Sequence, residues 1–268
     1  MDNVSRNRTT SLDSHEDPPV VADSDCMNKR AVTAGIICFS VHPQTDMIYL
    51  LLGKETRNGN IVGRWCDFGG ALMEDETVEQ AAAREFTEET ICALDMTDTW
   101  RELLPVDHTS TSRTPSFSHY QHYIENMLLN EEYTARVKLL TNRASERVAR
   151  EYFLKRIQWQ PRTVEYFNAI RSSLLRLHRL NGHQQPNTHH ISRALALHPS
   201  LSMVHGSEGR AFSVDRDFLE KQQIQYWSLD RLEEVLQENG QWRHHLFRQS
   251  FLPVLRIVVD QLRQLYYS

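Results

Sequence analysis

The sequence predicts an α+β protein, an α/β/α sandwich, rather than a doubly wound parallel sheet. Two β-rich runs, at 32–42 and 46–54, follow one another closely and are separated by a short turn that contains Pro43. A strongly helical stretch comes next, at 77–91, and the later elements follow in the order strands, helices, strand, helices. The chain has no internal repeat, and this order of elements is typical of an α+β protein or an α/β/α sandwich.

The first half of the chain is expected to hold four or more strands around one helix. The first two runs are predicted to pair antiparallel, and 65–68 forms a short strand that ends at Gly69 and Gly70. The helix begins with a capping box, because Thr77 is followed three residues later by Gln80. Two more strands are expected after this helix, at 100–107 and 119–127.

The second half is expected to be mainly helical. From about 130 to 180 the apolar residues recur at spacings of three and four, which predicts helices. A last short strand is predicted at 224–227, and Ser228 is placed to cap a helix that continues through Leu236. A long helix is expected over 242–265.

The composition indicates a globular protein rather than a wholly disordered one. The 268 residues are 40% hydrophobic and 24% charged, enough for one large domain or a domain with a sizeable insertion. The four cysteines show no C-x-x-C spacing, which argues against a disulfide framework and favours a reducing, cytoplasmic compartment of the producing cell or of a host cell. No membrane is expected as a partner, because the longest apolar run is interrupted by Arg256 and Asp260. Residues 1–30 are expected to be a disordered tail without a signal sequence.

Three carboxylates on the first helix point to metal chemistry. Glu85, Glu88 and Glu89 stand at positions i, i+3 and i+4, so all three project from one helix face. Three like charges in such proximity are costly unless a cation compensates them, and oxygen ligands suit Mg²⁺ or Mn²⁺ best. Gly70 permits close approach of the backbone, so its carbonyl is a further candidate ligand. An acidic helix face can equally be just solvated, and the carboxylates alone do not decide.

The wider spacing around these carboxylates favours the metal site. The stretch from Gly70 to Cys92 has the form G-x5-E-x7-R-E-x2-E-E and resembles the Nudix box of the Nudix hydrolases. The matching positions are Gly70, Glu76, Arg84, Glu85, Phe86, Glu88 and Glu89. The chain departs from the usual pattern at Ile91, where the family has glycine, and at Phe68, where it has proline; neither position supplies a metal carboxylate.

The resemblance implies a Nudix α/β/α sandwich with a mixed sheet and a hydrolase that cleaves a phosphoanhydride in a nucleoside diphosphate linked to another group. It implies metal binding by Glu85, Glu88, Glu89 and the Gly70 carbonyl, and a supporting role for Arg84 and Glu76 in the catalytic loop and helix. Glu88 or Glu89 is expected to accept the proton of the attacking water, with Glu125 and Glu208 as alternatives outside the box. The expected division is a tail at 1–30, a first Nudix part at 31–128, a basic helical insertion at 129–205 and a last Nudix part at 206–268.

Charge is distributed unevenly. The segment from 134 to 186 contains eleven basic and three acidic residues, a balance of +8, whereas the rest of the chain carries −13. A basic segment on an otherwise acidic chain favours a binding surface for a polyanion, with Arg143, Arg147 and Arg150 as tentative contacts. In its charge distribution the chain resembles the mRNA-decapping Nudix enzymes, whose substrate is capped RNA. Lys54 and Trp65 are further tentative substrate contacts, although Trp65 can instead pack the sheet and Lys54 can face solvent.

Several alternatives stay open at this point. The basic segment can be a solvated face that docks on the acidic remainder, with its aromatic residues in the core. A second enzymatic hypothesis is a small-molecule pyrophosphatase acting on ADP-ribose, NADH or a dinucleoside polyphosphate, and a third is a diphosphoinositol polyphosphate phosphatase. A non-catalytic ligand sensor is the fourth, and the intact set of glutamates argues against it. The sequence does not predict an oligomeric state.

Overall fold

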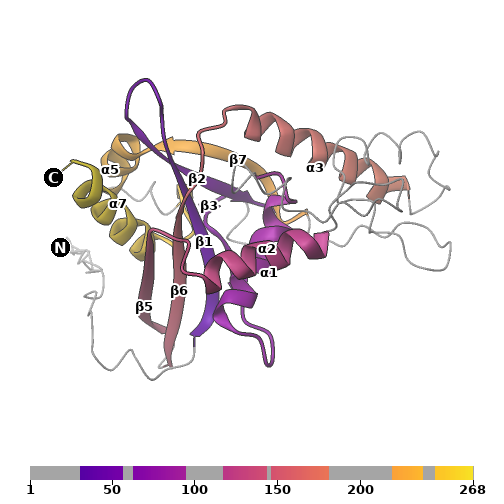
Figure 1. Ribbon diagram of the computed structural model, residues 1–268, viewed down its shortest axis with the longest axis horizontal. Coiled ribbons are helices and arrows are strands. Elements are labelled where there is room, and N and C mark those ends of the chain that lie inside the picture. Colours follow the sequence, from indigo (N-terminus) through magenta and orange to yellow (C-terminus); the bar gives the residue numbers. More distant parts are fainter. Residues whose placement is uncertain are drawn as a thin grey trace, which may run out of the picture.

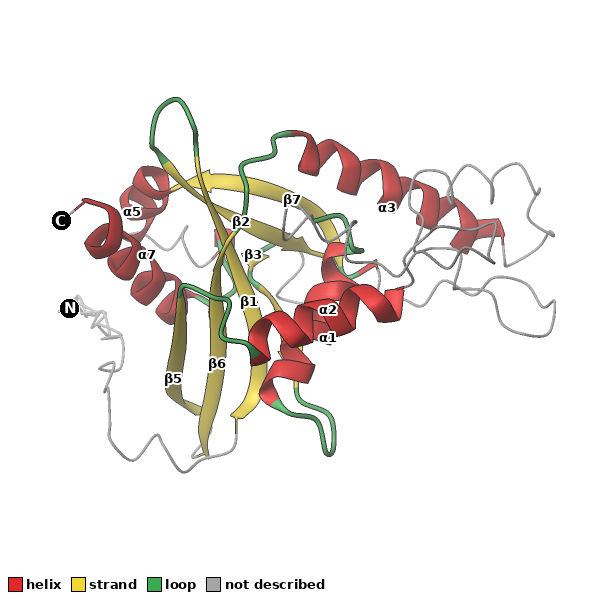
Figure 2. Ribbon diagram, viewed as in Figure 1, coloured by secondary structure: helices red, strands yellow, loops and turns green. Residues whose placement is uncertain are grey.

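The computed structural model describes residues 31–56, 63–94, 117–143, 146–180, 219–237 and 245–267. Within this part of the chain one mixed sheet of seven strands lies between two groups of helices, as Figures 1 and 2 show. The strands are β1 (Ala31–Val41), β2 (Ile48–Glu55), β3 (Trp65–Cys66), β4 (Phe68–Ala71), β5 (Ala135–Arg143), β6 (Glu146–Arg156) and β7 (Lys221–Ser228). This arrangement confirms the α+β class and the mixed sheet.

The sheet is built around β1. The strands run in the order β3-β2-β1-β6-β5, while β4 also pairs with β1 and β7 also pairs with β2. Among the strands that the structure describes, β1 and β6 form the one parallel pair. β1 pairs antiparallel with β4 and also with β2, as the short connection through Pro43 predicts. β7 pairs antiparallel with β2, which brings residues from near position 221 beside Gly53 and Glu55.

Helices cover both faces of the sheet. The helices in the described part are α1 (Val78–Thr90), α2 (Phe117–Leu129), α3 (Arg162–Leu180), α5 (Leu229–Gln237) and α7 (Leu252–Tyr267). In Figure 1, α5 and α7 lie on one side of the sheet, and α1, α2 and α3 lie on the other. None of the described helices combines the length and the apolar character that crossing a membrane requires.

The side chains of β1 alternate between the two faces of the sheet, and each face has its own hydrophobic core. Ile36 and Cys38 pack with the apolar residues of α1, α2 and α3, whereas Ile37 and Phe39 pack with those of α5 and α7. Successive side chains of a strand point to opposite faces, so a run of buried residues in β1 is what a sheet covered on both sides requires. The catalytic candidates all belong to the α1 side.

The strand predicted at 119–127 is wrong: this stretch lies within α2. Tyr120, Ile124, Met127 and Leu128 are all buried, and their spacing of four, three and one puts them on one helix face against α1. Alternating polar residues between them suggested a strand, but the helical period determines the packing. The strand predicted at 100–107 lies outside the described residues, as does the tail.

The helices predicted from 130 to 156 are wrong as well. This stretch forms β5 and β6, and β6 pairs in parallel with β1 in the middle of the sheet. Val137 and Leu139 are buried at a period of two, with the basic residue Lys138 between them. β5 and β6 therefore complete the central sheet, and the helix predicted in the later part of this stretch is α3, which occupies 162–180. The division into a Nudix domain and an insertion stays a prediction.

The C-terminal elements match the expectation with one change. β7 contains the predicted strand, and the Ser228 hydroxyl accepts a hydrogen bond from the Arg231 N–H at 3.3 Å, so the predicted cap of α5 is confirmed. α7 begins at Leu252 rather than near 242. Pro253 explains the later start, because proline lacks an amide donor and is favoured in the first turn of a helix.

The start of α1 gives a first testable prediction. The Thr77 hydroxyl accepts the Gln80 N–H at 3.2 Å, and the Gln80 side chain accepts the Thr77 N–H at 3.0 Å, so the predicted capping box is confirmed. We expect Thr77→Ala to lower the free energy of unfolding by about 1 kcal/mol, because an N-terminal amide loses its partner. Urea unfolding measures this difference. Thr77→Ser keeps the oxygen, and an equal loss in both variants would contradict the capping account.

Candidate active site

Helix α1 carries two acidic side chains into the edge of the core. Its apolar face is anchored by buried alanines and by Phe86, which packs edge-to-face on Phe68 with ring centroids 5.7 Å apart. Glu85 and Glu89, one helical turn apart, are only 8% and 2% exposed. The two carboxylates are therefore buried next to β4. On an ordinary acidic surface they would be exposed to solvent.

The loop glycine makes room for the first carboxylate. Gly70 pairs with Ala34 across β4 and β1, and a Cβ atom at position 70 would lie 2.2 Å from Oε1 of Glu85. That distance is far below a van der Waals contact, so any side chain at position 70 would push the Glu85 carboxylate away. The sequence predicted a close backbone approach at this glycine, and the atom that approaches is a carboxylate oxygen of the same site.

The second carboxylate is held from both sides. Oε2 of Glu89 accepts the backbone N–H of Gly69 at 2.8 Å, and Oε1 lies 2.9 Å from Nζ of Lys221. Burial raises the pKa of the Glu89 carboxyl to about 8; Lys221 opposes the rise, and the neighbouring Glu55 and Glu85 add to it. A cation that enters this site would therefore relieve a real electrostatic cost.

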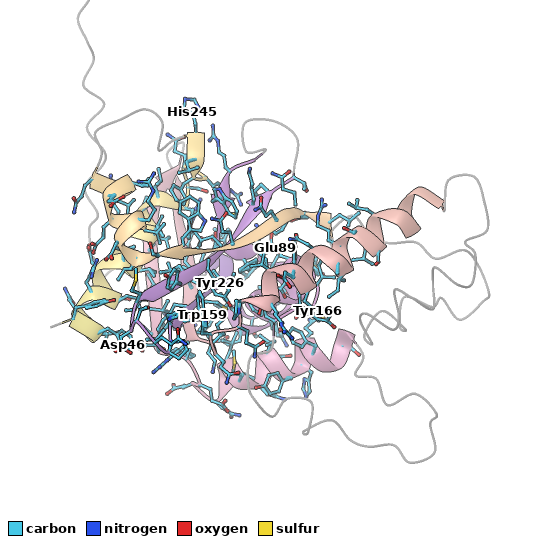
Figure 3. The ribbon with its side chains drawn as sticks, turned by 90° about the horizontal axis from the view of Figure 1, so that it is seen from above. Asp46, Glu89, Trp159, Tyr166, Tyr226 and His245 are labelled. Carbon is cyan, nitrogen blue, oxygen red and sulfur yellow. The ribbon has the colours of Figure 1, made fainter. Side chains whose placement is uncertain are left out.

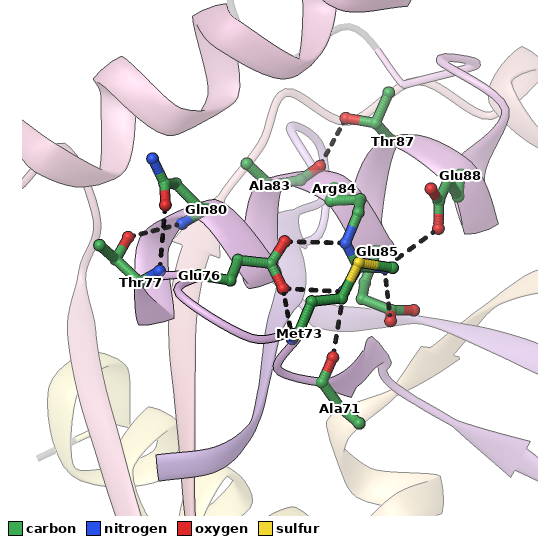
Figure 4. Close-up of polar contacts among 10 residues, drawn as sticks. All are labelled: Ala71, Met73, Glu76, Thr77, Gln80, Ala83, Arg84, Glu85, Thr87 and Glu88. Carbon is green, nitrogen blue, oxygen red and sulfur yellow. Dashed lines mark hydrogen bonds and ion pairs between the residues drawn. The ribbon is translucent and has the colours of Figure 1, made fainter. Parts of the chain in front are cut away.

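Arg84 clamps the loop onto the helix, as Figure 4 shows. Its Nε donates to Oε1 of Glu76 at 2.8 Å, its Nη1 donates to Oε1 of Glu85 at 2.8 Å, and its Nη2 donates to the Ala71 carbonyl at 3.0 Å. The other oxygen of Glu76 accepts the Met73 N–H at 2.9 Å, and contact with Arg84 helps lower the pKa of Glu76 against the effect of burial. The contacts join Arg84, Glu76 and the loop backbone, and the supporting role of these two residues in catalysis stays a prediction.

The clamp gives a second prediction. Arg84→Lys keeps the charge but loses the planar fork of donors. We expect the free energy of unfolding to fall by about 2 kcal/mol and turnover to fall by about tenfold, because charge-assisted hydrogen bonds at this level of burial are lost. Urea unfolding and initial rates measure both. Arg231→Lys, at an exposed pair with Glu234 on α5, is the control, and equal effects in the two variants would contradict the clamp.

The described part of the chain brings three carboxylates together. Oxygen atoms of Glu85, Glu89 and Glu220 all lie within 4.8 Å of one another. An all-oxygen donor set at a partly buried position suits a hard divalent cation such as Mg²⁺ or Mn²⁺. Together with the cradle at Gly70, these three residues fit the expected ion, and Glu220 had not been predicted as a ligand.

Glu88, the third predicted metal ligand on α1, lies outside that group of three. Its Oε2 is 3.3 Å from Nη1 of Arg84, and 18% of its side chain is exposed, against 1% for Glu89. Metal binding by Glu88 and by the Gly70 carbonyl therefore stays a prediction. Of the alternatives for a proton acceptor, Glu125 lies on α2 beside His122, with Nδ1 and Oε2 3.8 Å apart, and Glu208 lies outside the described residues.

The exit of α1 shows how the chain tolerates its departure from the usual glycine. Ile91 adopts a left-handed conformation with φ of 56°, which costs a non-glycine residue about 1 kcal/mol. Its N–H donates to the Glu88 carbonyl at 3.3 Å, and its side chain is buried at 2% exposure. Helix α1 thus ends in the left-handed conformation that glycine usually adopts. Burial of the isoleucine side chain offsets the cost of that backbone conformation.

The tentative substrate contacts have different surroundings. Trp65 is only 5% exposed and packs edge-to-face on Trp227, with ring centroids 5.5 Å apart, which favours the packing alternative. Lys54 lies over the Trp65 ring at 5.7 Å. Arg150 donates from Nη1 to the Ser250 carbonyl at 2.8 Å. Arg143 and Arg147 sit at the turn end of β5 and β6, but their side chains lie outside the described part.

Other basic side chains of the 134–186 segment also have internal partners. Arg136 reaches Glu151 at 2.7 Å and Glu79 at 3.1 Å, and Lys138 lies 3.3 Å from Glu151. Lys155 donates to the Glu132 carbonyl at 2.6 Å. These contacts support the alternative in which much of this basic segment serves the fold itself.

Three members of the site were missed by sequence reasoning. Lys221 is the first residue of β7, Glu220 directly precedes it, and Glu55 is the last residue of β2. In the sequence, Glu220 and Lys221 are a charged pair next to the predicted strand at 224–227. Such pairs are common at strand ends, so that signal does not single out Glu220 and Lys221 without the pairing of β7 with β2.

A mixed sheet between helices, with a glycine loop facing a carboxylate-bearing helix, defines a domain that can bind a divalent cation through its glutamates. Residues 29–146 match the family model of the NUDIX domain. Residues 29–146 therefore carry a NUDIX domain, and this range includes the stretch from Gly70 to Cys92 whose spacing predicted it. A search of curated proteins finds no match to the sequence.

Solved structures show a weak resemblance. The NUDIX domain of Shewanella oneidensis NrtR, complexed with ADP ribose, is 13% identical with a TM-score of 0.37, covering 90% of this chain and 93% of that one. A Caenorhabditis elegans Ap4A hydrolase binary complex is 12% identical with a TM-score of 0.36, covering 87% and 99%. A mutT/nudix family protein from Listeria innocua is 14% identical with a TM-score of 0.38, covering 89% and 98%. Likeness at this level does not assign a substrate.

Proposed function

We propose that the protein is a divalent-metal-dependent pyrophosphohydrolase that cleaves a phosphoanhydride in a small nucleoside diphosphate linked to another group. One observation carries the proposal: oxygens of Glu85, Glu89 and Glu220 lie within 4.8 Å of one another, next to Gly69 and Gly70 of β4. A diphosphate carries several negative charges that must be neutralised before water can attack. A group of buried carboxylates attracts the cation that does so.

Each residue of the site has a defined part in this mechanism. Glu85, Glu89 and Glu220 would hold Mg²⁺ or Mn²⁺, which when bound neutralises the diphosphate and lowers the pKa of a coordinated water. Arg84 keeps Glu85 aimed at the loop and ties Glu76 to the loop backbone. Glu88 suits the role of proton acceptor better than Glu89, because 18% of its side chain is exposed against 1% for Glu89.

A small substrate is favoured over capped RNA by the basic segment itself. The RNA hypothesis depends on its +8 balance as a free polyanion surface. Arg136 and Lys138 are instead paired with Glu151, and Arg150 and Lys155 donate to backbone carbonyls. Internal contacts of this kind leave fewer cations for phosphates along an RNA chain, so ADP-ribose, NADH and dinucleoside polyphosphates become the leading candidates.

A panel of substrates tests the proposal. ADP-ribose, NADH, a dinucleoside polyphosphate, a diphosphoinositol polyphosphate and a capped RNA of about thirty nucleotides are compared at equal concentration with Mg²⁺ or Mn²⁺. We expect ADP-ribose, NADH or the dinucleoside polyphosphate to be hydrolysed, and Arg143→Gln with Arg147→Gln to leave that rate unchanged. Release of methylguanosine diphosphate from RNA, suppressed steeply by salt, would instead support decapping. Binding without turnover of any substrate would indicate a sensor.

A further inference from the structure

A buried ammonium group lies directly behind the carboxylate cluster. The side chain of Lys221 is 0% exposed, and its Nζ lies 2.8 Å from Oε1 of Glu55 and 2.9 Å from Oε1 of Glu89. It also donates to Sγ of Cys66 at 3.0 Å. Figure 3 shows Glu89 among the packed side chains at the centre of the molecule, whereas Asp46 and His245 lie at its edge.

The ammonium group of Lys221 balances the charge of two buried carboxylates. Glu55 and Glu89 are each 1% exposed at the side chain, and both face the single ammonium of Lys221. Nη1 of Arg248 also lies 3.6 Å from Oε1 of Glu55, but Arg248 makes no ion pair with Glu89 among the described residues. Removing one partner from a buried pair leaves an uncompensated charge, which reorients or neutralises.

The backbone around Lys221 is shaped to hold this side chain. A Cβ atom at Gly53 would lie 2.8 Å from Cδ of Lys221, so the glycine in β2 leaves space for the aliphatic stem. From the other side, Nε of Arg171 on α3 donates to the Lys221 carbonyl at 2.7 Å. The preceding residue is Glu220, so the same anchor that fixes Lys221 also fixes a carboxylate of the cluster.

We propose that Lys221 is a positioning residue that acts through Glu89. Its ammonium and the Gly69 N–H fix the two oxygens of the Glu89 carboxylate in the orientation in which, with Glu85 and Glu220, it can hold a divalent cation. A carboxylate oxygen has more than one lone pair, so a contact with Lys221 and a bond to a metal are compatible. This inference rests on the proposed function, because it assumes that Glu89 is a metal ligand.

Mn²⁺ binding to the purified protein, followed by electron paramagnetic resonance without substrate, tests the proposal. We expect Lys221→Met to weaken Mn²⁺ binding by about tenfold to a hundredfold, as loss of an outer partner of a metal ligand does. A purely electrostatic role predicts the opposite sign, because removing a nearby positive charge should tighten the binding of a cation. Lys138→Met, at a half-exposed pair with Glu151, is the matched control and should bind Mn²⁺ as the parent does.

A second variant keeps the ammonium group of Lys221 but displaces it. Gly53→Ala places a methyl group against the stem of Lys221, and we expect Mn²⁺ binding to weaken in this variant too. If Lys221→Met does not fold, Mn²⁺ binding to Gly53→Ala tests the positioning role of Lys221. Parental or tighter binding in either folded variant overturns the proposal. Because no substrate is involved, failure to hydrolyse the substrate panel and failure of Lys221 as a positioning residue are separate results.

Discussion

Glu85→Gln should lower kcat by about a thousandfold while the protein stays folded. Glutamine preserves the shape of the side chain in its cradle at Gly70 but removes the charge that a divalent cation needs. Losing about 4 kcal/mol of transition-state stabilisation corresponds to a factor of about a thousand in rate. Initial rates on the substrate that the panel identifies, with saturating Mg²⁺, measure the effect.

Glu79→Gln provides the matched control for that experiment. Glu79 lies in the first turn of the same helix, but its carboxylate pairs with Arg136 at 3.1 Å, away from the cluster. The same chemical change there should leave kcat within about twofold of the parent, because an exposed or half-exposed ion pair contributes little. A Glu85→Gln enzyme that turns over as fast as the Glu79→Gln enzyme would exclude Glu85 from the chemistry.

Gly70→Ala is the second change with a large expected effect. The added Cβ would lie 2.2 Å from Oε1 and 2.3 Å from Cδ of Glu85, so the carboxylate must leave its position. We expect kcat to fall by about a hundredfold or more, because displacing a catalytic group by about 1 Å costs about that factor. Initial rates and Mn²⁺ binding measure the loss.

Ala71→Ser separates this effect from a general disturbance of β4. Ala71 is the next residue and is exposed, so a hydroxyl there meets solvent, while its carbonyl remains the acceptor for Arg84. We expect Ala71→Ser to keep parental activity. If Gly70→Ala kept it as well, the close packing of loop and carboxylate would not be required for the reaction.

The local parts of the site could be predicted from sequence. The capping box at Thr77 and Gln80 depends on residues three positions apart, and the structure confirms it. The placement of Glu85 and Glu89 on one face of α1 follows from the helical period alone. The family model over 29–146 then confirms the resemblance that this spacing indicated.

The non-local parts could not be predicted from sequence. Lys221 meets Glu89 only because β7 pairs with β2, and no period in the sequence specifies which strand β7 joins. β5 and β6 were mistaken for helices because apolar residues in 130–156 fit both periods over short runs. Pairing of β6 with β1, more than a hundred residues earlier, is a tertiary contact that overrides local preference.

The central claim is that the cluster of Glu85, Glu89 and Glu220 holds the divalent cation needed for phosphoanhydride hydrolysis. The most direct test is product analysis on ADP-ribose and the other small substrates with protein stripped by EDTA, before and after Mg²⁺ is restored. The account predicts no cleavage without metal, recovery with Mg²⁺ or Mn²⁺, and no recovery in Glu85→Gln. Cleavage by the stripped protein, or full recovery in Glu85→Gln, would contradict it.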